Sequence, residues 1–291
     1  MWEHLQIELY KVFKRPRTYL SFAAITALIG VIQLGLLVDG KEYADFVMAD
    51  FANSFSVDGK ILNGYFICYV ILQLLLVHVP LLIALIAADM ISGEANMGTL
   101  RILLTKPQSG TSIVMAKFIA SVIYTLLLLI WIAIMGLFLS MLIFGTDDLF
   151  LMKSSYVVIV KESDVFWRYA GAFCFAALAM VTVAALGFFL SFFAENSIGP
   201  IVATMSVIIV CTILSTMNIP LFNLIKPYLF TTHMITWKEF FDFKVNDANE
   251  AIIGSIQYPD KIIRSATVLA VHIVLFVGSA VWLFRKKDIL S

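Results

Sequence analysis

The chain has 291 residues, of which 61% are hydrophobic and 14% are charged, and its formal net charge at pH 7 is zero. Soluble domains are about half apolar and about a quarter charged, so this composition excludes an ordinary soluble globule and indicates an integral membrane protein. No basic run exceeds a few residues, which gives no support to nucleic-acid binding.

The first fifteen residues predict an amphipathic helix. Its apolar residues recur on one helical face: Trp2, Leu5, Leu9, Val12 and Phe13. The charged residues Glu3, Glu8, Lys11 and Lys14 lie largely elsewhere, a pattern typical of a helix in the membrane interface. Pro16 ends this helix before the first long apolar segment. The helix is interpreted either as an elbow that bears on a cytoplasmic partner or as a plain topology anchor, and the two interpretations are compatible.

Six apolar runs are long enough to cross a bilayer core, which needs about 20 residues. We expect each run to be a helix, because hydrocarbon offers backbone polar groups no hydrogen-bond partner. None shows the alternation of a transmembrane β-barrel strand. The predicted spans are residues 19–38, 64–88, 113–144, 169–194, 198–217 and 265–284. The sequence therefore predicts a single all-α transmembrane domain over residues 1–291.

The basic residues near the span ends predict the orientation, since cytoplasmic segments are enriched in Lys and Arg. Four stand just before the first span and three just after the last: Lys11, Lys14, Arg15, Arg17, Arg285, Lys286 and Lys287. Both termini and the connection Ile91–Lys117 are therefore expected on the cytoplasmic side of a cytoplasmic (inner) membrane. The first apolar run is too long for a typical signal-peptide core, and no clear cleavage site follows it.

The connection Ile91–Lys117 predicts an ordered element between the second and third spans. Its apolar residues recur at helical spacing: Met97, Leu100, Leu103 and Leu104. Pro107 then ends the helix, because proline lacks the amide hydrogen and disfavours helix in the residue before it. We expect a short amphipathic helix over residues 91–107, held rigidly between two spans.

Three connections are expected on the outer side. Residues 39–63 form an acidic loop, and Val157–Val160 is either a short strand or an interfacial segment. Residues 218–264 open with apolar stretches that Pro220 and Pro227 interrupt. Such a pattern favours short helices that dip part-way into the outer leaflet.

The sequence predicts no catalytic, metal or cofactor site. The three cysteines, Cys68, Cys174 and Cys211, fall inside spans and are interpreted as small buried apolar residues. No H-E-x-x-H pair, G-x-S-x-G elbow or G-x-x-x-x-G-K-[ST] phosphate loop is present. His78 and His272 are the titratable residues deep in the spans, and each is expected to bond to a neighbouring helix.

A resemblance to a known family rests on the connection after the second span. Its residues Glu94, Gly98, Thr99, Leu100, Pro107 and Lys117 fit the pattern E-x-x-x-G-T-L … P-x-S … K. This pattern resembles the segment between the second and third spans of ABC type-2 transporter permeases, the membrane subunits of ATP-binding-cassette exporters. Many members of that family have Arg just after the P-x-S step, where this chain has Gly110.

The resemblance implies a permease that pairs with a second copy or a homologue and binds two copies of a cytoplasmic ABC ATPase. ATP and Mg²⁺ would be held by that ATPase, so no cofactor is expected in this chain. The helix over residues 91–107 would be the coupling element, with Glu94 pairing with a basic or amide group of the ATPase. The residues implied in coupling are Glu94, Gly98, Thr99, Leu100, Arg101 and Pro107.

The coupling residues also have a plainer interpretation. Glu94 and Asp89 would then be solvated neighbours of the lipid head groups, and Gly98-Thr99 would be a turn.

The expected function is thus an exporter subunit for an amphiphilic substrate, in contact with membrane lipid. The rival hypotheses are an ion-coupled secondary carrier and a non-transporting membrane sensor or scaffold.

Overall fold

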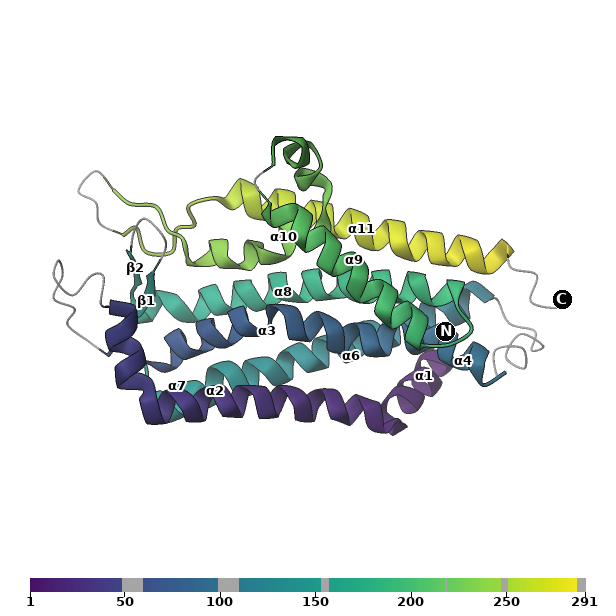
Figure 1. Ribbon diagram of the computed structural model, residues 1–291, viewed down its shortest axis with the longest axis horizontal. Helices are drawn as coiled ribbons and strands as arrows, with labels where there is room; N and C mark the ends of the chain where they lie inside the picture. Colours follow the sequence, from purple (N-terminus) through teal and green to yellow (C-terminus); the bar gives the residue numbers. More distant parts are fainter. Residues whose placement is uncertain (49–59, 99–109, 153–156, 218, 247–250, 287–291) are drawn as a thin grey trace.

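The computed structural model describes the chain except for residues 49–59, 99–109, 153–156, 218, 247–250 and 287–291. Its long helices lie side by side in one elongated bundle (Figure 1). The end of the bundle that holds the N-terminus is called the terminal end, and the opposite end, which holds the two strands, is called the hairpin end.

Within the described residues, six helices are long and apolar enough to cross a membrane, which confirms a multi-pass, predominantly helical membrane protein. The spans agree with the predicted ones to within a few residues at most ends, because each is a long apolar run whose length alone specifies it. They are α2 (Pro16–Met48), α3 (Gly64–Ala87), a composite third span, α8 (Glu162–Leu190), α9 (Ile198–Thr216) and α11 (Pro259–Lys286). Within α2 the span covers residues 16–40, and a kink at Asp39 separates it from a helical continuation to Met48. The expectation of a loop from residue 39 was therefore wrong for the part that precedes residue 49.

The third span is made of three consecutive pieces: α6 (Gly110–Ile132), the π-helical turn η1 (Ala133–Phe138) and α7 (Leu139–Phe144). A π-helix leaves a backbone carbonyl off the usual i→i−4 ladder. Here the buried Gln33 of α2 donates from Nε2 to the Met135 carbonyl at 2.8 Å and to the Ser140 hydroxyl at 2.9 Å. The first and third spans are thereby joined by polar bonds inside the bundle.

The span surfaces are rich in exposed apolar side chains, for example Val31, Leu142 and Val274. Apolar area on this scale is typical of a surface that lipid covers. Cys68 is buried as expected, whereas Cys174 is exposed on this surface and Cys211 is half-buried. The expectation of three buried cysteines was therefore wrong for Cys174, because the face of a helix that meets lipid is as apolar as the face that meets protein.

The two deep histidines bond within their own helices. His78 Nδ1 lies 2.9 Å from the Leu74 carbonyl, and His272 Nδ1 lies 2.8 Å from the Val268 carbonyl. The expectation that each would bond to a neighbouring helix was wrong, since the imidazole can reach the carbonyl one turn earlier.

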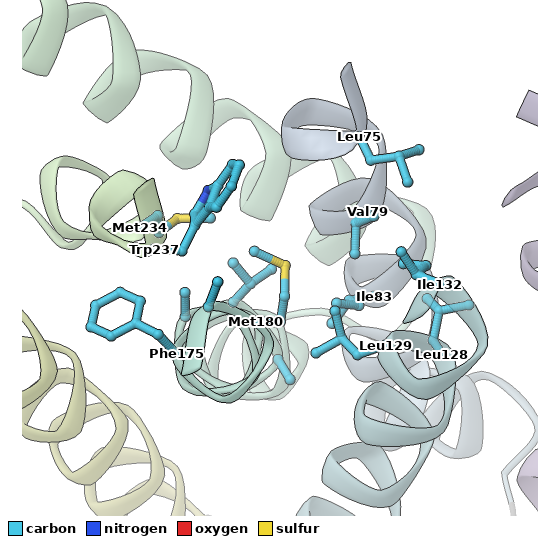
Figure 2. Close-up of a cluster of buried hydrophobic side chains, with 14 of the residues drawn as sticks. Leu75, Val79, Ile83, Leu128, Leu129, Ile132, Phe175, Met180, Met234 and Trp237 are labelled. Atoms are coloured by element: carbon cyan, nitrogen blue, oxygen red, sulfur yellow. The ribbon is translucent and has the colours of Figure 1, made fainter. Parts of the chain in front are cut away.

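Helix α8 is the centre of the bundle and contacts α3, α6 and α11. Figure 2 shows Met180 and Phe175 of α8 between two groups of buried apolar side chains. One group comes from α3 and α6, and the other comes from the segment that precedes α11. The labelled residues of these groups are Leu75, Val79, Ile83, Leu128, Leu129, Ile132, Met234 and Trp237.

At the hairpin end, β1 (Leu149–Met152) pairs with β2 (Val157–Val160) as a two-stranded antiparallel sheet. Of the two interpretations left open for Val157–Val160, the strand is therefore right. The side chain of Asn63 accepts a hydrogen bond from the Phe66 amide at 3.0 Å and donates to the Asp148 carbonyl at 2.8 Å. It both caps α3 and ties that helix to the hairpin.

The segment between the last two spans forms short helices, as expected from its prolines. They are η3 (Pro220–Leu224), η4 (Lys226–Tyr228), α10 (Phe230–Met234) and η5 (Ile235–Phe241). Helix α10 contacts α8, α9 and α11, and η5 contacts α8 and α11. Helix α10 and η5 are thus packed onto the bundle, whereas η3 and η4, which have no buried residue, project from it (Figure 1).

Arg168 of α8 fastens this segment to the bundle. Its guanidinium is fully buried and binds the Asp164 carboxylate with contacts of 2.6 and 3.0 Å. It also donates to the carbonyls of Phe240 at 2.7 Å and Ser255 at 2.9 Å. The Gly254 amide donates to Asp164 at 3.1 Å, so the same ion pair holds both ends of the excursion that follows η5.

We expect Arg168→Met to destabilise the protein by about 3–5 kcal/mol, because it leaves the Asp164 carboxylate and two carbonyls without their buried donor. The matched control is Lys161→Met, which removes an exposed lysine from its 2.6 Å pair with Asp148 and should leave the melting temperature nearly unchanged. Thermal unfolding of both variants in detergent measures the difference. Equal melting temperatures for the two variants would contradict the role given to Arg168.

Candidate functional site: a buried charge network at the terminal end

Four charged side chains from three helices meet at the terminal end. Glu8 and Lys11 come from α1 (Trp2–Lys14), Glu94 comes from α4 (Asp89–Asn96), and Lys117 comes from α6. Lys117 Nζ lies 2.8 Å from Glu8 and 2.7 Å from Glu94. Lys11 Nζ closes the square at 2.9 Å from Glu8 and 2.7 Å from Glu94. We call these four residues the charge square.

Burial makes the charge square energetically demanding. Lys117 has no exposed surface, and Glu94 is only 3% exposed. Removing ions from water costs several kcal/mol each, and close opposite charges offset that cost only with good geometry. Two lysines facing two carboxylates satisfy this condition. The square is therefore stable as a set, and the loss of one member would leave an uncompensated buried charge.

The pKa values of two members follow from this geometry. Burial by itself would raise the pKa of Glu94, but the nearby Lys117 charge and hydrogen bonds from Lys11 and Lys117 outweigh it and lower that pKa. Burial likewise opposes the charged form of Lys11, but hydrogen bonds to Glu94 and Glu8 leave its pKa raised. Both groups are thus held in their charged forms around neutral pH.

A second cluster adjoins the charge square through Asp89, the first residue of α4. Its carboxylate binds the Arg15 guanidinium, lies 2.9 Å from Arg17 and accepts a hydrogen bond from Ser197. A β-carbon at Gly93 would collide with this carboxylate, so glycine is required one turn later. Asp89 connects α4 to the junction of α1 and α2 and to the start of α9.

The local sequence explains how α1 and α2 present these groups. Arg15 is extended because Pro16 follows it, so α1 ends at Lys14 and α2 begins at Pro16. The Thr18 hydroxyl donates to the Val12 carbonyl at 2.5 Å and fixes the angle between the two helices. The sequence predicted this break at Pro16.

The coupling helix expected over residues 91–107 differs from the structure. Helix α4 ends at Asn96, and Gly98 follows with a φ of +69° and its amide donating to the Ala95 carbonyl at 3.0 Å. Only glycine adopts this left-handed conformation readily, so Gly98 ends the helix. The apolar spacing gave no sign of this break, and residues 99–107 of the expected helix lie outside the described part of the chain.

The expectations for the residues implied in coupling are met to different degrees by the structure. Gly98 forms the turn of the plainer interpretation, and Met97 beside it is 58% exposed. Glu94 is buried and bound to lysines of its own chain, so neither a solvated carboxylate nor one pointing at another protein describes it. The residues Thr99, Leu100, Arg101 and Pro107 lie outside the described part of the chain.

The N-terminal helix forms as predicted, but its faces do not divide as expected. Leu5 and Leu9 pack against the core, Phe13 is half-buried, and Trp2 is exposed. The unexpected member is Glu8, which is buried between α1 and α6. A residue-type pattern assigns a glutamate to the polar face because it contains no sign of Lys117, which lies 109 residues further on.

Sequence reasoning therefore missed Glu8, Lys11, Asp89 and Lys117 as one site, although Lys117 belonged to the family pattern. The available signal was Lys117 itself, a lysine one turn inside a long apolar run, which needs a carboxylate partner. Among the described residues, no three His, Cys, Asp or Glu side chains gather to hold a metal ion. The arrangement can transmit force between helices.

We expect Lys117→Met to release α1 from the bundle, because Glu8 and Glu94 would then share one lysine. The assay places one cysteine at position 12, buried against α6, in a background that lacks Cys174 and Cys211. Its maleimide labelling should rise by at least about tenfold in Lys117→Met. Lys14→Met is the control, since Lys14 lies over the Tyr10 ring at 5.3 Å outside the charge square. Equal labelling of the two variants would contradict the assignment.

The pKa shifts predict where pH weakens the charge square. Because the pKa of Glu94 is lowered in the folded protein, its charge adds to the free energy of unfolding. This contribution is fully present above the ordinary glutamate pKa of about 4.3 and is lost as the pH falls through the folded pKa. The pKa of Lys11 is raised in the folded protein, so the contribution of Lys11 to the free energy of unfolding is lost only as the pH rises through that raised pKa. The melting temperatures of wild type and Glu94→Gln should differ by a constant amount near neutral pH and converge below about pH 4. A difference that grows in acid would contradict the inferred sign.

Comparisons with known proteins give the relationship of the chain but no activity. A relative in Bacillus subtilis (strain 168), named "Uncharacterized protein YhcI", is 25% identical over 211 residues. The match covers 70% of this chain and 63% of that relative, so the chain spans less than two thirds of the relative's length. The family model described as "Protein of unknown function (DUF2705)" matches residues 22–290. Because this match covers most of the chain, the protein belongs to the DUF2705 family.

Proposed function

We propose that the chain is the permease subunit of an ATP-driven ABC transporter that exports an amphiphilic substrate. Two permeases, either identical or homologous, form the pathway, and two copies of a separate cytoplasmic ATPase supply the energy. The terminal end, where α1 begins and α11 ends, faces the cytoplasm of the inner membrane. ATP and Mg²⁺ bind to the ATPase.

The pairing of Glu94 with Lys117 at 2.7 Å is the observation that carries this proposal. They are the two charged residues of the family pattern, and their contact fixes α4 to the third span. The same carboxylate binds Lys11, so α4 is fixed to α1 as well. Such a connection is stiff, as a coupling element has to be.

A push on α4 would reach several spans through identified contacts. Asp89 binds Arg15 and Arg17 near the start of the first span, and Ser197 just before the fifth. Lys117 lies near the start of α6, the first piece of the third span. The approach of two ATPases on binding ATP would therefore tilt these spans together and change the pathway between the two permeases.

The exposed C-terminal end of α4 is where the ATPase docks in this proposal. Met97 projects from it, and a β-carbon at Gly98 would meet no described residue within 4 Å.

We expect Met97→Asp to abolish co-purification of the ATPase, because it places a charge on an apolar docking contact. The chain is co-expressed with an ABC ATPase encoded by a neighbouring gene, and both the retained ATPase and its ATP hydrolysis are measured. Lys117→Met should retain the ATPase but lose the stimulation of hydrolysis by the permease. Docking and coupling are thereby separated.

The matched control is Ile253→Asp, which changes an isoleucine with 69% exposure near the hairpin end. It should leave both readouts unchanged. Retention of the ATPase by Met97→Asp at the wild-type level, or its equal loss in Ile253→Asp, would overturn the proposed docking site. Gradient-driven transport by vesicles that lack the ATPase would overturn the proposed energy source.

A further inference from the structure

Helix α1 buries one face and leaves the other uncovered by the described part of the chain. Glu8 and Val12 are buried, and α1 packs on α6 and α2, set at an angle to α2 (Figure 1). On the uncovered face Ile7 is exposed, and Tyr10, one turn later, is 64% exposed. Large apolar and aromatic side chains on the surface of a helix mark contact with lipid or with another protein.

An ammonium group on this face has no ionic partner. Lys14 follows Tyr10 by four residues, so both side chains lie on the same face of α1. Lys14 Nζ lies 5.3 Å from the centre of the Tyr10 ring, and it forms no ion pair with any described residue. Together with Leu9 and Phe13, these two side chains line an open hollow of about 370 Å³. The hollow therefore combines apolar walls with a positive charge that lacks a counter-ion.

Two arginines at the junction of α1 and α2 add to this positive charge. Arg15 and Arg17 both pair with the single carboxylate of Asp89, so the described ion pairs set one carboxylate against these two bases and Lys14. The charge square beside them is neutral, because it holds two lysines and two carboxylates. Glu3 shares the face of Tyr10 but lies two turns earlier. The junction thus carries a local excess of positive charge.

The position of this charge indicates what covers the face. The first span begins at Pro16, directly after Arg15, and its early residues Tyr19 and Leu20 are exposed. Lipid chains cover the surface of a span, so basic residues just before it lie at the depth of the lipid head groups. Anionic head groups are attracted to Lys and Arg at that depth. A zwitterionic lipid would cover the apolar walls but leave the positive excess unmatched.

We infer that the hollow on α1 binds an anionic phospholipid, with its phosphate on Lys14 and Arg17. Arg17 can take part because its side chain is 42% exposed and has further N–H groups besides the nitrogen that binds Asp89. The upper part of one acyl chain lies on Leu9 and Phe13. This lipid covers the outer face of α1, so it requires neither the ATPase nor a second permease. The inference is independent of the proposed function.

The test uses the purified chain in phosphatidylcholine nanodiscs that contain a small fraction of phosphatidylglycerol with a diazirine near its head group. Photolabelled peptides, identified by mass spectrometry, should include α1. Lys14→Gln should reduce the labelling of α1 about fivefold, the effect expected for one lysine beside an anionic lipid surface. Lys14→Arg should restore it, because arginine keeps the positive charge.

The matched control is Lys286→Gln. Lys286 is also a lysine at the terminal end that lies over an aromatic ring, 4.1 Å from the centre of the Trp282 ring. This variant should leave the labelling of α1 unchanged. A diazirine phosphatidylcholine should label α1 less than the anionic probe does and should not respond to Lys14→Gln. An excess of inorganic phosphate should not compete, because it has no acyl chain.

A second measurement separates loss of the lipid from loss of α1 itself. Maleimide labelling of a cysteine at position 12 should be the same in Lys14→Gln and in the wild type, because Lys14 lies outside the charge square. A rise in that labelling would mean that Lys14 acts on the docking of α1, and would overturn its assignment as a lipid ligand.

Other results would also overturn the inference. These are equal labelling of α1 in Lys14→Gln and Lys286→Gln, equal labelling by the two lipids, and displacement of the anionic probe by inorganic phosphate. Cross-linking that shows Ile7 and Tyr10 covered by a second copy of the chain would assign the face to a protein instead. Because the assay contains no ATPase, its failure is distinguishable from loss of docking in Met97→Asp.

Discussion

The structure depends on the neutralisation of one fully buried ammonium, that of Lys117. A lysine within an apolar span cannot remain charged there without partners, and its partners come from α1 and α4, which lie outside the spans. The electrostatic requirement of one residue in the third span therefore determines where the N-terminal helix docks and how the connection after the second span is held. Glu8 and Glu94 each bind both lysines of the charge square, so each carboxylate links Lys117 to Lys11.

The two ends of the bundle use the same physical device for different purposes. At the terminal end, the charge square and Asp89 join four separate parts of the chain, which include the starts of three spans. At the hairpin end, Arg168 and Asp164 hold the ends of an excursion against a single helix, α8. Only the first arrangement connects an exposed element, the end of α4, to spans on different sides of the bundle. This difference is why the proposed site of force input lies at the terminal end.

Between the two ends, the buried Gln33 shows how a polar side chain is held inside the bundle. Gln33 binds the Met135 carbonyl in the π-helical turn, so this polar side chain in the first span has a structural use.

The sequence by itself determined the membrane class, the six spans, the amphipathic helix ended by Pro16 and the short pieces set by Pro220 and Pro227. These features follow from local composition, because span length, apolar periodicity and the missing amide of proline act within a few residues. It also indicated Glu94 and Lys117 through a family resemblance, but it placed Glu94 toward another protein and Glu8 on a polar face. Only the tertiary structure decided that both carboxylates are buried on Lys117 and that Gly98 ends α4. The physical reason is that a buried charge is stable only with a counter-charge, and these partners come from segments far apart in the chain.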